Sequence, residues 1–236
     1  YHIFQDGVLQ NDEQTLRGPG LAVVLDFSFH RPSTLMIKSG LSTVSSAKAY
    51  ANYRAEMPEW NFQHVRQSVR KSWNDLLKTV QVSGTTERKQ LFYTALYHSC
   101  HMPVRAADVD GEYRGTDNAV HRASFPYYDA YSLWDTFRTK YPLLSLIQPQ
   151  VLQDIVRSFV LIYEQGGRYW PYPTTRREHT VAIIADAYYK GLQAFDLEKA
   201  YQGMRRDAYE FRAEFNNATT ADKTMMSDYA MKAIYE

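Results

Sequence analysis

The chain has 236 residues, enough for one large domain or two small ones. Its formal net charge is +1 at pH 7 and its basic residues are scattered, which argues against nucleic acid or an acidic membrane surface as a partner. No apolar run approaches the roughly 18 residues that a membrane span needs, and the single cysteine excludes an intrachain disulfide.

Residues 1–45 have the pattern of β structure. From Leu21 to Phe29, apolar residues alternate with smaller or polar ones, and this period of two predicts a half-buried strand. Arg31-Pro32-Ser33 is typical of a turn, so we expect another strand at Leu35–Lys38. Gly18-Pro19-Gly20 separates these strands from the preceding one.

The next stretch changes to helical spacing. An Ala-rich helix is predicted over Ala47–Ala55, and it stops before Pro58. A second helix begins near Phe62 and carries an apolar stripe, which we interpret as core. After the Ser83–Thr86 break, a third helix begins at Glu87, an acidic residue in the favoured first turn.

The segment Asp108–Gly115 contains several carboxylates and resembles a calcium loop at first sight. An EF-hand loop needs its glycine at the sixth position and a glutamate at the twelfth. Here the glycine is at the fourth position. We therefore predict that Asp110-Gly111 forms a tight turn between two short strands.

The densest chemical signal begins at Tyr127. Five aromatic residues, two Asp and one Arg fall within the twelve residues that end at Arg138. Aromatic faces suit the apolar side of a pyranose, and carboxylate and guanidinium groups bind its hydroxyls, so this pattern favours a sugar site. The alternative is a core aromatic pair with an internal bridge between Asp135 and Arg138, because buried charges need partners.

The rest of the chain is predicted to be helical. A stripe over Leu152–Tyr163 ends at Gly166-Gly167. Another helix begins near Thr180, and Asp196 is expected to cap the one that follows. Residues 221–236 are expected to form one more helix.

Five segments are similar to sequence motifs of one enzyme family: Phe92–Ser99, Ser132–Thr139, Tyr141–Leu144, Tyr163–Gly167 and Ile184–Gly191. On these segments the chain resembles glycoside hydrolase family 92, which comprises exo-acting, calcium-dependent α-mannosidases. The resemblance covers most of residues 20–210.

The resemblance implies an α+β fold that is mainly helical. Residues 1–45 would be the C-terminal strands of a β-sandwich, and residues 46–85 a helical linker. Residues 86–236 would be part of an (α/α)6 toroid built from helix pairs, roughly half of a ring.

The resemblance also implies a set of site residues. Trp134, Asp135 and Arg138 are carried over as residues that bind the terminal mannose. Trp170 is expected to line the same pocket, and His179 falls where the family often has a site histidine. Calcium is the cofactor of the resembled family, but we identify no calcium ligand, and no other metal site, in this chain.

No catalytic residue can be carried over. An inverting glycosidase needs a protonated carboxyl group and an ionised one on opposite faces of the sugar. The family's acid, in an Asn-Glu-Thr segment, has no counterpart between Arg168 and His179. Glu178 is the only carboxylate there, and the adjacent Arg176 and Arg177 favour its ionised form, which is wrong for a general acid. The family's catalytic bases and calcium-holding residues lie beyond Glu236.

Two functions are therefore expected. The first is an α-mannosidase chain that hydrolyses terminal α-mannosides by inversion. The alternative is a catalytically inactive structural or interaction subunit, or a carbohydrate-binding pseudo-enzyme, in which other protein chains complete the fold. The resemblance implies a secreted or periplasmic protein, although the chain has no signal-peptide pattern.

Overall fold

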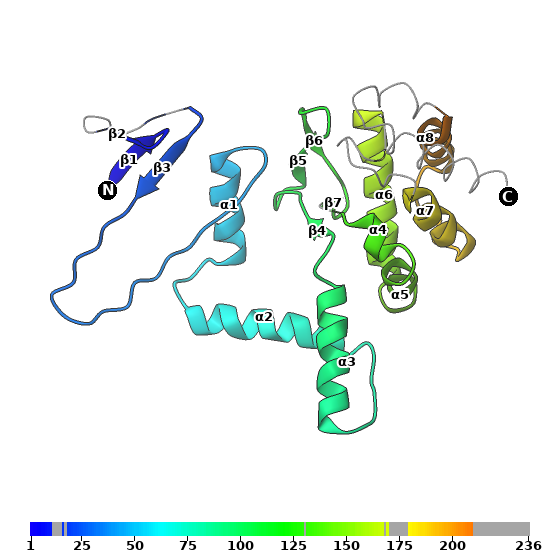
Figure 1. Ribbon diagram of the computed structural model, residues 1–236, viewed down its shortest axis with the longest axis horizontal. Helices are drawn as coiled ribbons and strands as arrows, with labels where there is room; N and C mark the ends of the chain where they lie inside the picture. Colours follow the sequence, from blue (N-terminus) through cyan, green and yellow to red (C-terminus); the bar gives the residue numbers. More distant parts are fainter. Residues whose placement is uncertain (11–15, 17, 130, 168, 170–178, 210–236) are drawn as a thin grey trace, which may run out of the picture. The chain divides into compact units, whose positions relative to one another are not determined.

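The computed structural model describes residues 1–10, 16, 18–129, 131–167, 169 and 179–209. About half of these residues are helical, and the described strands form three small sheets (Figure 1). The chain divides into two compact units, Tyr1–Lys38 and Ser39–Glu236. Within the described residues, no helix is both long enough and apolar enough to cross a membrane.

The first unit is a three-stranded antiparallel sheet. Its strands β1 (His2–Gln5), β2 (Val8–Gln10) and β3 (Leu21–Val24) are ordered β2-β1-β3. Asp6 and Gly7 form the two-residue connection between β1 and β2, with φ angles of +50° and +81°. Positive φ at both positions is the geometry of a hairpin turn that favours Asp-Gly.

The strand predicted from Leu21 to Phe29 is shorter than expected. It ends at Val24, which pairs with His2, and the strand predicted at Leu35–Lys38 is not formed. Beyond Val24 the alternating pattern has no strand partner among the described residues. The predicted half-burial is also wrong, because every residue of β3 is exposed.

The second unit begins with three capped helices, α1 (Ser46–Glu56), α2 (Phe62–Leu77) and α3 (Thr86–Ser99), near the predicted positions. Each is preceded by a residue whose side-chain oxygen accepts a hydrogen bond from a backbone N–H of the first turn, as N-caps do. These caps are Ser45, Asn61 and Thr85.

Four short strands follow: β4 (Val104–Arg105), β5 (Glu112–Arg114), β6 (Val120–Arg122) and β7 (Tyr128–Asp129). Asp110-Gly111 does form a turn, in which Gly111 N–H donates to Asp108 O at 2.8 Å. Asp108 N–H also donates to Glu112 O at 2.7 Å across this turn, but among the described residues no strand pair extends from it. β5 pairs with β6, and β4 pairs with β7, because the two segments that flank the turn each have a later partner.

The core lies around one long helix. It is α6 (Pro149–Gly166), which packs against α5 (Lys140–Ile147), α7 (His179–Tyr189), α8 (Leu197–Tyr209) and β7 (Figure 1). The apolar stripe predicted for α6 is buried, and Ile155, Val156 and Phe159 have no exposed surface. The β5–β6 hairpin joins this core through Tyr113, whose ring stacks on Tyr127 with centroids 3.8 Å apart.

The predicted ends of these helices are confirmed. Gly167 follows α6 with φ +69°, the left-handed conformation that favours glycine after a helix. Asp196 caps α8, and its Oδ1 accepts from Lys199 N–H at 3.0 Å. The helix predicted for residues 221–236 lies outside the described residues. The mixed, mainly helical class is confirmed, whereas the sandwich, the toroid and the domain bounds stay predictions.

Candidate functional site

The Trp-Asp-Thr-Phe-Arg motif occupies a short helix, α4 (Leu133–Thr136), and the turn after it. Leu133 is buried in the core and anchors this helix there. The preceding Tyr131 is buried as well, and its hydroxyl donates to Tyr128 O at 2.7 Å. Trp134 consequently faces outward and is 53% exposed. An exposed indole is costly in water, and such rings are common at binding surfaces.

Asp135 and Arg138 are exposed on the same segment. Ser132 Oγ donates to Asp135 Oδ2 at 2.8 Å, which orients the carboxylate. The guanidinium of Arg138 lies 5.1 Å from the centroid of the Phe137 ring, a cation–π contact. Within the described part of the chain, Asp135 and Arg138 form no ion pair with each other. The alternative of a core aromatic pair with an internal bridge therefore does not describe this surface.

His179 reaches the same motif from the buried side. It is the first residue of α7 and is almost fully buried. Its ring lies 4.3 Å from the ring of Phe137, centroid to centroid, at an angle of 56°. The fold thus brings four of the five expected residues to one place, with Trp134, Asp135 and Arg138 on the surface and His179 behind Phe137. The fifth, Trp170, lies outside the described residues.

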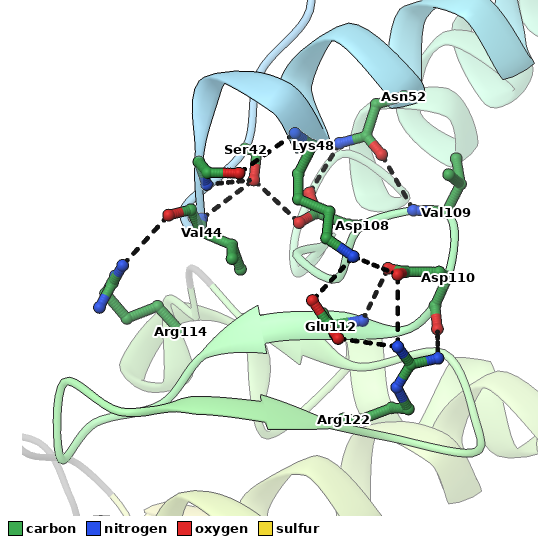
Figure 2. Close-up of polar contacts among 11 residues, drawn as sticks. Ser42, Val44, Lys48, Asn52, Asp108, Val109, Asp110, Glu112, Arg114 and Arg122 are labelled. Atoms are coloured by element: carbon green, nitrogen blue, oxygen red, sulfur yellow. Dashed lines mark hydrogen bonds and ion pairs between the residues drawn. The ribbon is translucent and has the colours of Figure 1, made fainter.

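A second polar cluster joins α1 to the turn before β5 (Figure 2). Asp108 is buried, and its two carboxylate oxygens accept hydrogen bonds from Ser42 Oγ at 2.8 Å and from Asn52 Nδ2 at 2.7 Å. Asn52 Oδ1 in turn accepts from Val109 N–H at 3.0 Å. This cluster fixes α1 against the β4–β5 turn.

The neighbouring carboxylates of this turn are also paired. Lys48 on α1 bridges Asp110 and Glu112, and Arg122 on β6 lies 2.7 Å from Glu112 Oε1 (Figure 2). The hydrogen bond from Lys48 lowers the pKa of Asp110 and of Glu112 below their ordinary values. The carboxylate oxygens of Asp110 and Glu112 are therefore paired with the side chains of Lys48 and Arg122.

The calcium expectation is not supported by a ligand set. Among the residues that the structure describes, no group of three or more His, Cys, Asp or Glu side chains is arranged to hold a metal ion. Calcium prefers six to eight oxygen ligands. A calcium requirement stays an expectation from the resemblance.

One residue beside the motif was missed by the sequence analysis. Lys140 begins α5 and is buried, and it forms no ion pair with any described residue. Burial lowers the pKa of its ammonium group, because removal from water disfavours the charged form. Its position within the apolar run that ends at Ile147 was the only signal in the sequence.

Two open grooves lie away from this site. They have volumes of about 550 and 270 Å³ and are lined by side chains of α3 and α2, respectively, not by the motif. The Trp134 surface is therefore a face with aromatic and charged groups and does not border either groove.

The matches with known proteins all point to the same family. A family model described as the glycosyl hydrolase family 92 catalytic domain matches residues 48–235. A family GH92 alpha-mannosidase from Bacteroides thetaiotaomicron is 25% identical over 88% of this chain, with a TM-score of 0.70, and the match covers 30% of that structure. No curated protein sequence matches the chain.

Two further solved structures agree. A GH92 family glycosyl hydrolase is 34% identical over 75% of this chain, with a TM-score of 0.64 and 25% of that structure covered. A family GH92 inverting mannosidase from Bacteroides thetaiotaomicron is 28% identical over 71% of this chain, with a TM-score of 0.64 and 24% covered. The chain therefore spans less than a third of the length of the structures that it resembles.

Proposed function

The chain belongs to glycoside hydrolase family 92, and from this premise we propose that it forms the part of an α-mannosidase that binds the terminal mannose. In this proposal the strands β1–β3 are the end of a β-sandwich and the helices from α3 onward are part of an (α/α)6 toroid. The whole enzyme hydrolyses a terminal α-mannoside with inversion.

The outward-facing Trp134 with Asp135 and Arg138 beside it is the observation that supports this proposal. The indole face packs on the C–H side of a pyranose and removes apolar surface from water. The Asp135 carboxylate accepts hydrogen bonds from sugar hydroxyls, and Ser132 holds it in one orientation. The planar guanidinium of Arg138 donates to other hydroxyl oxygens.

The chemical step is not assigned to any residue of this chain. Inversion needs two carboxyl groups about 6.5–9.5 Å apart with a water between them. On the motif surface, Asp135 is the carboxylate that the structure describes, and its role in the proposal is binding. No calcium ligand is assigned either, because the described residues contain no group of three or more His, Cys, Asp or Glu side chains that could hold a metal ion.

An inactive carbohydrate-binding or interaction subunit is the second candidate. One observation favours it: much of the apolar surface of α2 and α3 is exposed, which suits a chain that is completed by other polypeptide. Activity separates the two candidates. Turnover of an α-mannoside by the protein isolated from the cells that make it, together with any polypeptide that completes it, supports the enzyme if it is lost on chelation and restored by calcium. Binding of the sugar by the same preparation without turnover supports the subunit.

Binding of mannose tests the site itself. We expect Trp134→Ala to weaken the affinity for an α-mannoside about 10- to 100-fold, which corresponds to roughly 1.4–2.8 kcal/mol for a lost stacking ring. Trp60→Ala is the matched control, because Trp60 is 59% exposed at another place. Titration calorimetry with a methyl α-mannoside measures both. Equal affinities for the two variants and the parent chain would contradict the sugar-binding role.

A further inference from the structure

The helix α2 has an apolar stripe that the described residues leave largely exposed. Phe62, Val65, Val69, Trp73 and Leu76 are spaced three or four residues apart, so they share one face. Phe62 is 66% exposed, and no residue of α2 is fully buried. A helix with such a stripe normally buries it against another element, because most helix stability in proteins comes from that packing.

The partner helix α3 is also largely exposed among the described residues. Leu96 is its one buried residue among those described, and Leu91 is 73% exposed. The two helices meet where the rings of Trp73 and Tyr97 lie 4.5 Å apart, centroid to centroid. Both grooves described above lie on this pair of helices, one lined by Val69 and Leu76 and the other by Tyr93 and Tyr97. We call α2 and α3 together the helical hairpin.

The polar border of the stripe carries positive charge. Arg66 and Arg70 lie one turn apart on α2 and form no ion pair with any described residue. A surface of this kind fits a polypeptide that offers apolar side chains to the stripe and carboxylates to the two guanidinium groups, since charges at an interface border are usually complemented.

The comparisons indicate what the occupant is. The match to the family catalytic domain begins at residue 48, so it includes the whole helical hairpin. The solved relatives contain far more polypeptide, because the chain covers only 24–30% of each. We infer that the apolar stripe of α2 is a packing surface for another part of a family 92 catalytic domain. This inference rests on family membership and is independent of the proposed mannosidase activity.

Two other occupants have the right general chemistry. A basic amphipathic helix with Trp and Phe on its apolar face also resembles helices that lie on anionic membranes. A second copy of this chain is the other possibility that a self-complementary apolar face allows. Family 92 polypeptide is favoured because α2 lies within a match to a catalytic domain.

A photo-crosslinking experiment in the cells that make the protein separates these occupants. Phe62→benzoylphenylalanine places the reactive group on the stripe with little change in shape, and Val69→benzoylphenylalanine is the second probe. The control probe replaces Leu146, which is 79% exposed on α5. We expect both stripe probes to crosslink to peptides of family 92 sequence that are not found in residues 1–236, at least ten-fold more than the control.

Every other result overturns the inference. Crosslinks to peptides from residues 1–236 indicate that a second copy or another segment of the same molecule covers the stripe, and equal yields for stripe and control probes indicate an exposed helix. Flotation of the purified protein with vesicles of anionic phospholipid, lost in the Val69→Asp variant, indicates a membrane surface. We expect no flotation, and we expect Val69→Asp to reduce the crosslink yield from position 62 by ten-fold or more.

Discussion

The helices α2 and α6 have similar apolar stripes but different surroundings. Eight residues of α6 are buried, and none of α2 is. Both helices fall within the match to the same catalytic domain. An apolar stripe at helical spacing shows which face of a helix is suited to packing. It does not show which other segment packs there, because that segment can lie far away in the sequence. The described residues around α6 cover its stripe, whereas those around α2 and α3 leave much of theirs exposed.

The strongest test compares two phenylalanines. Phe159 on α6 has no exposed surface, whereas Phe62 on α2 is mostly exposed. We expect Phe159→Ala to lower the free energy of unfolding by about 3–5 kcal/mol, because it loses apolar burial and leaves a cavity. Phe62→Ala should change it by less than about 0.5 kcal/mol. Urea titration of each purified variant measures both. A comparable loss for Phe62→Ala would show that α2 is covered in the isolated chain.

A second test asks whether α1 belongs to the packed body. Asp108→Ala removes the acceptor of two side-chain hydrogen bonds, from Ser42 and Asn52. We expect a loss of about 1–3 kcal/mol, since buried donors are left without partners. Asp75→Ala, at an exposed ion pair with Lys71, is the control and should cost much less, because water and salt screen exposed charges. Hydrogen exchange should show faster opening of α1 in the first variant alone, and slow exchange there would contradict the anchoring role.

A third test concerns a cation within the body. We expect Lys140→Met to raise the free energy of unfolding at pH 7 by about 1 kcal/mol, because an apolar side chain replaces a buried charge without a carboxylate partner. The folded-state pKa of Lys140 is lowered, so the unfolded chain binds more protons as the pH approaches 10.5. Stability of the parent should therefore rise with pH in that window, and the rise should be smaller in the variant. A destabilised variant would point to a functional or structural need for the ammonium group.

The smallest expected effect is the response of the Lys48 cluster to acid. The pKa values of Asp110 and Glu112 are depressed in the folded state, with Lys48 as the first cause. Their contribution is present above the ordinary pKa values of 3.8 and 4.5 and is lost as the pH falls through the lower folded-state values. We expect α1 to loosen below about pH 4, by hydrogen exchange, and Lys48→Met to remove that dependence. An unchanged profile in Lys48→Met would separate the cluster from the docking of α1.

Local features of this fold were predictable from the sequence. Gly167 after α6 and Asp196 before α8 act on their own neighbours, so short-range chemistry places them correctly. The length of β3 was not predictable, because a strand extends only where a partner strand pairs with it, and the alternating pattern does not identify that partner. The pairing of β4 with β7 was also not predictable, because it joins segments that are more than twenty residues apart in the sequence.

The candidate site shows the same division. The motif around Trp134 was recognisable from its residues, but its exposure depends on Leu133 and Tyr131 anchoring the turn in the core. The contact between Phe137 and His179 joins positions far apart in the chain and leaves no local pattern. The bonds from Ser42 and Asn52 to Asp108 are hidden in the sequence for the same reason.

The central position of α6 also has a consequence for how the chain is made. Ribosomes add about 5–20 residues per second, so the roughly 70 residues from the end of α3 to the end of α6 take on the order of 4–14 s. During that interval the uncovered rings and methyl groups of α2 and α3 have already emerged, while the helix that organises the body is still incomplete. The apolar surfaces of α2 and α3 are therefore synthesised several seconds before the core around α6 can form.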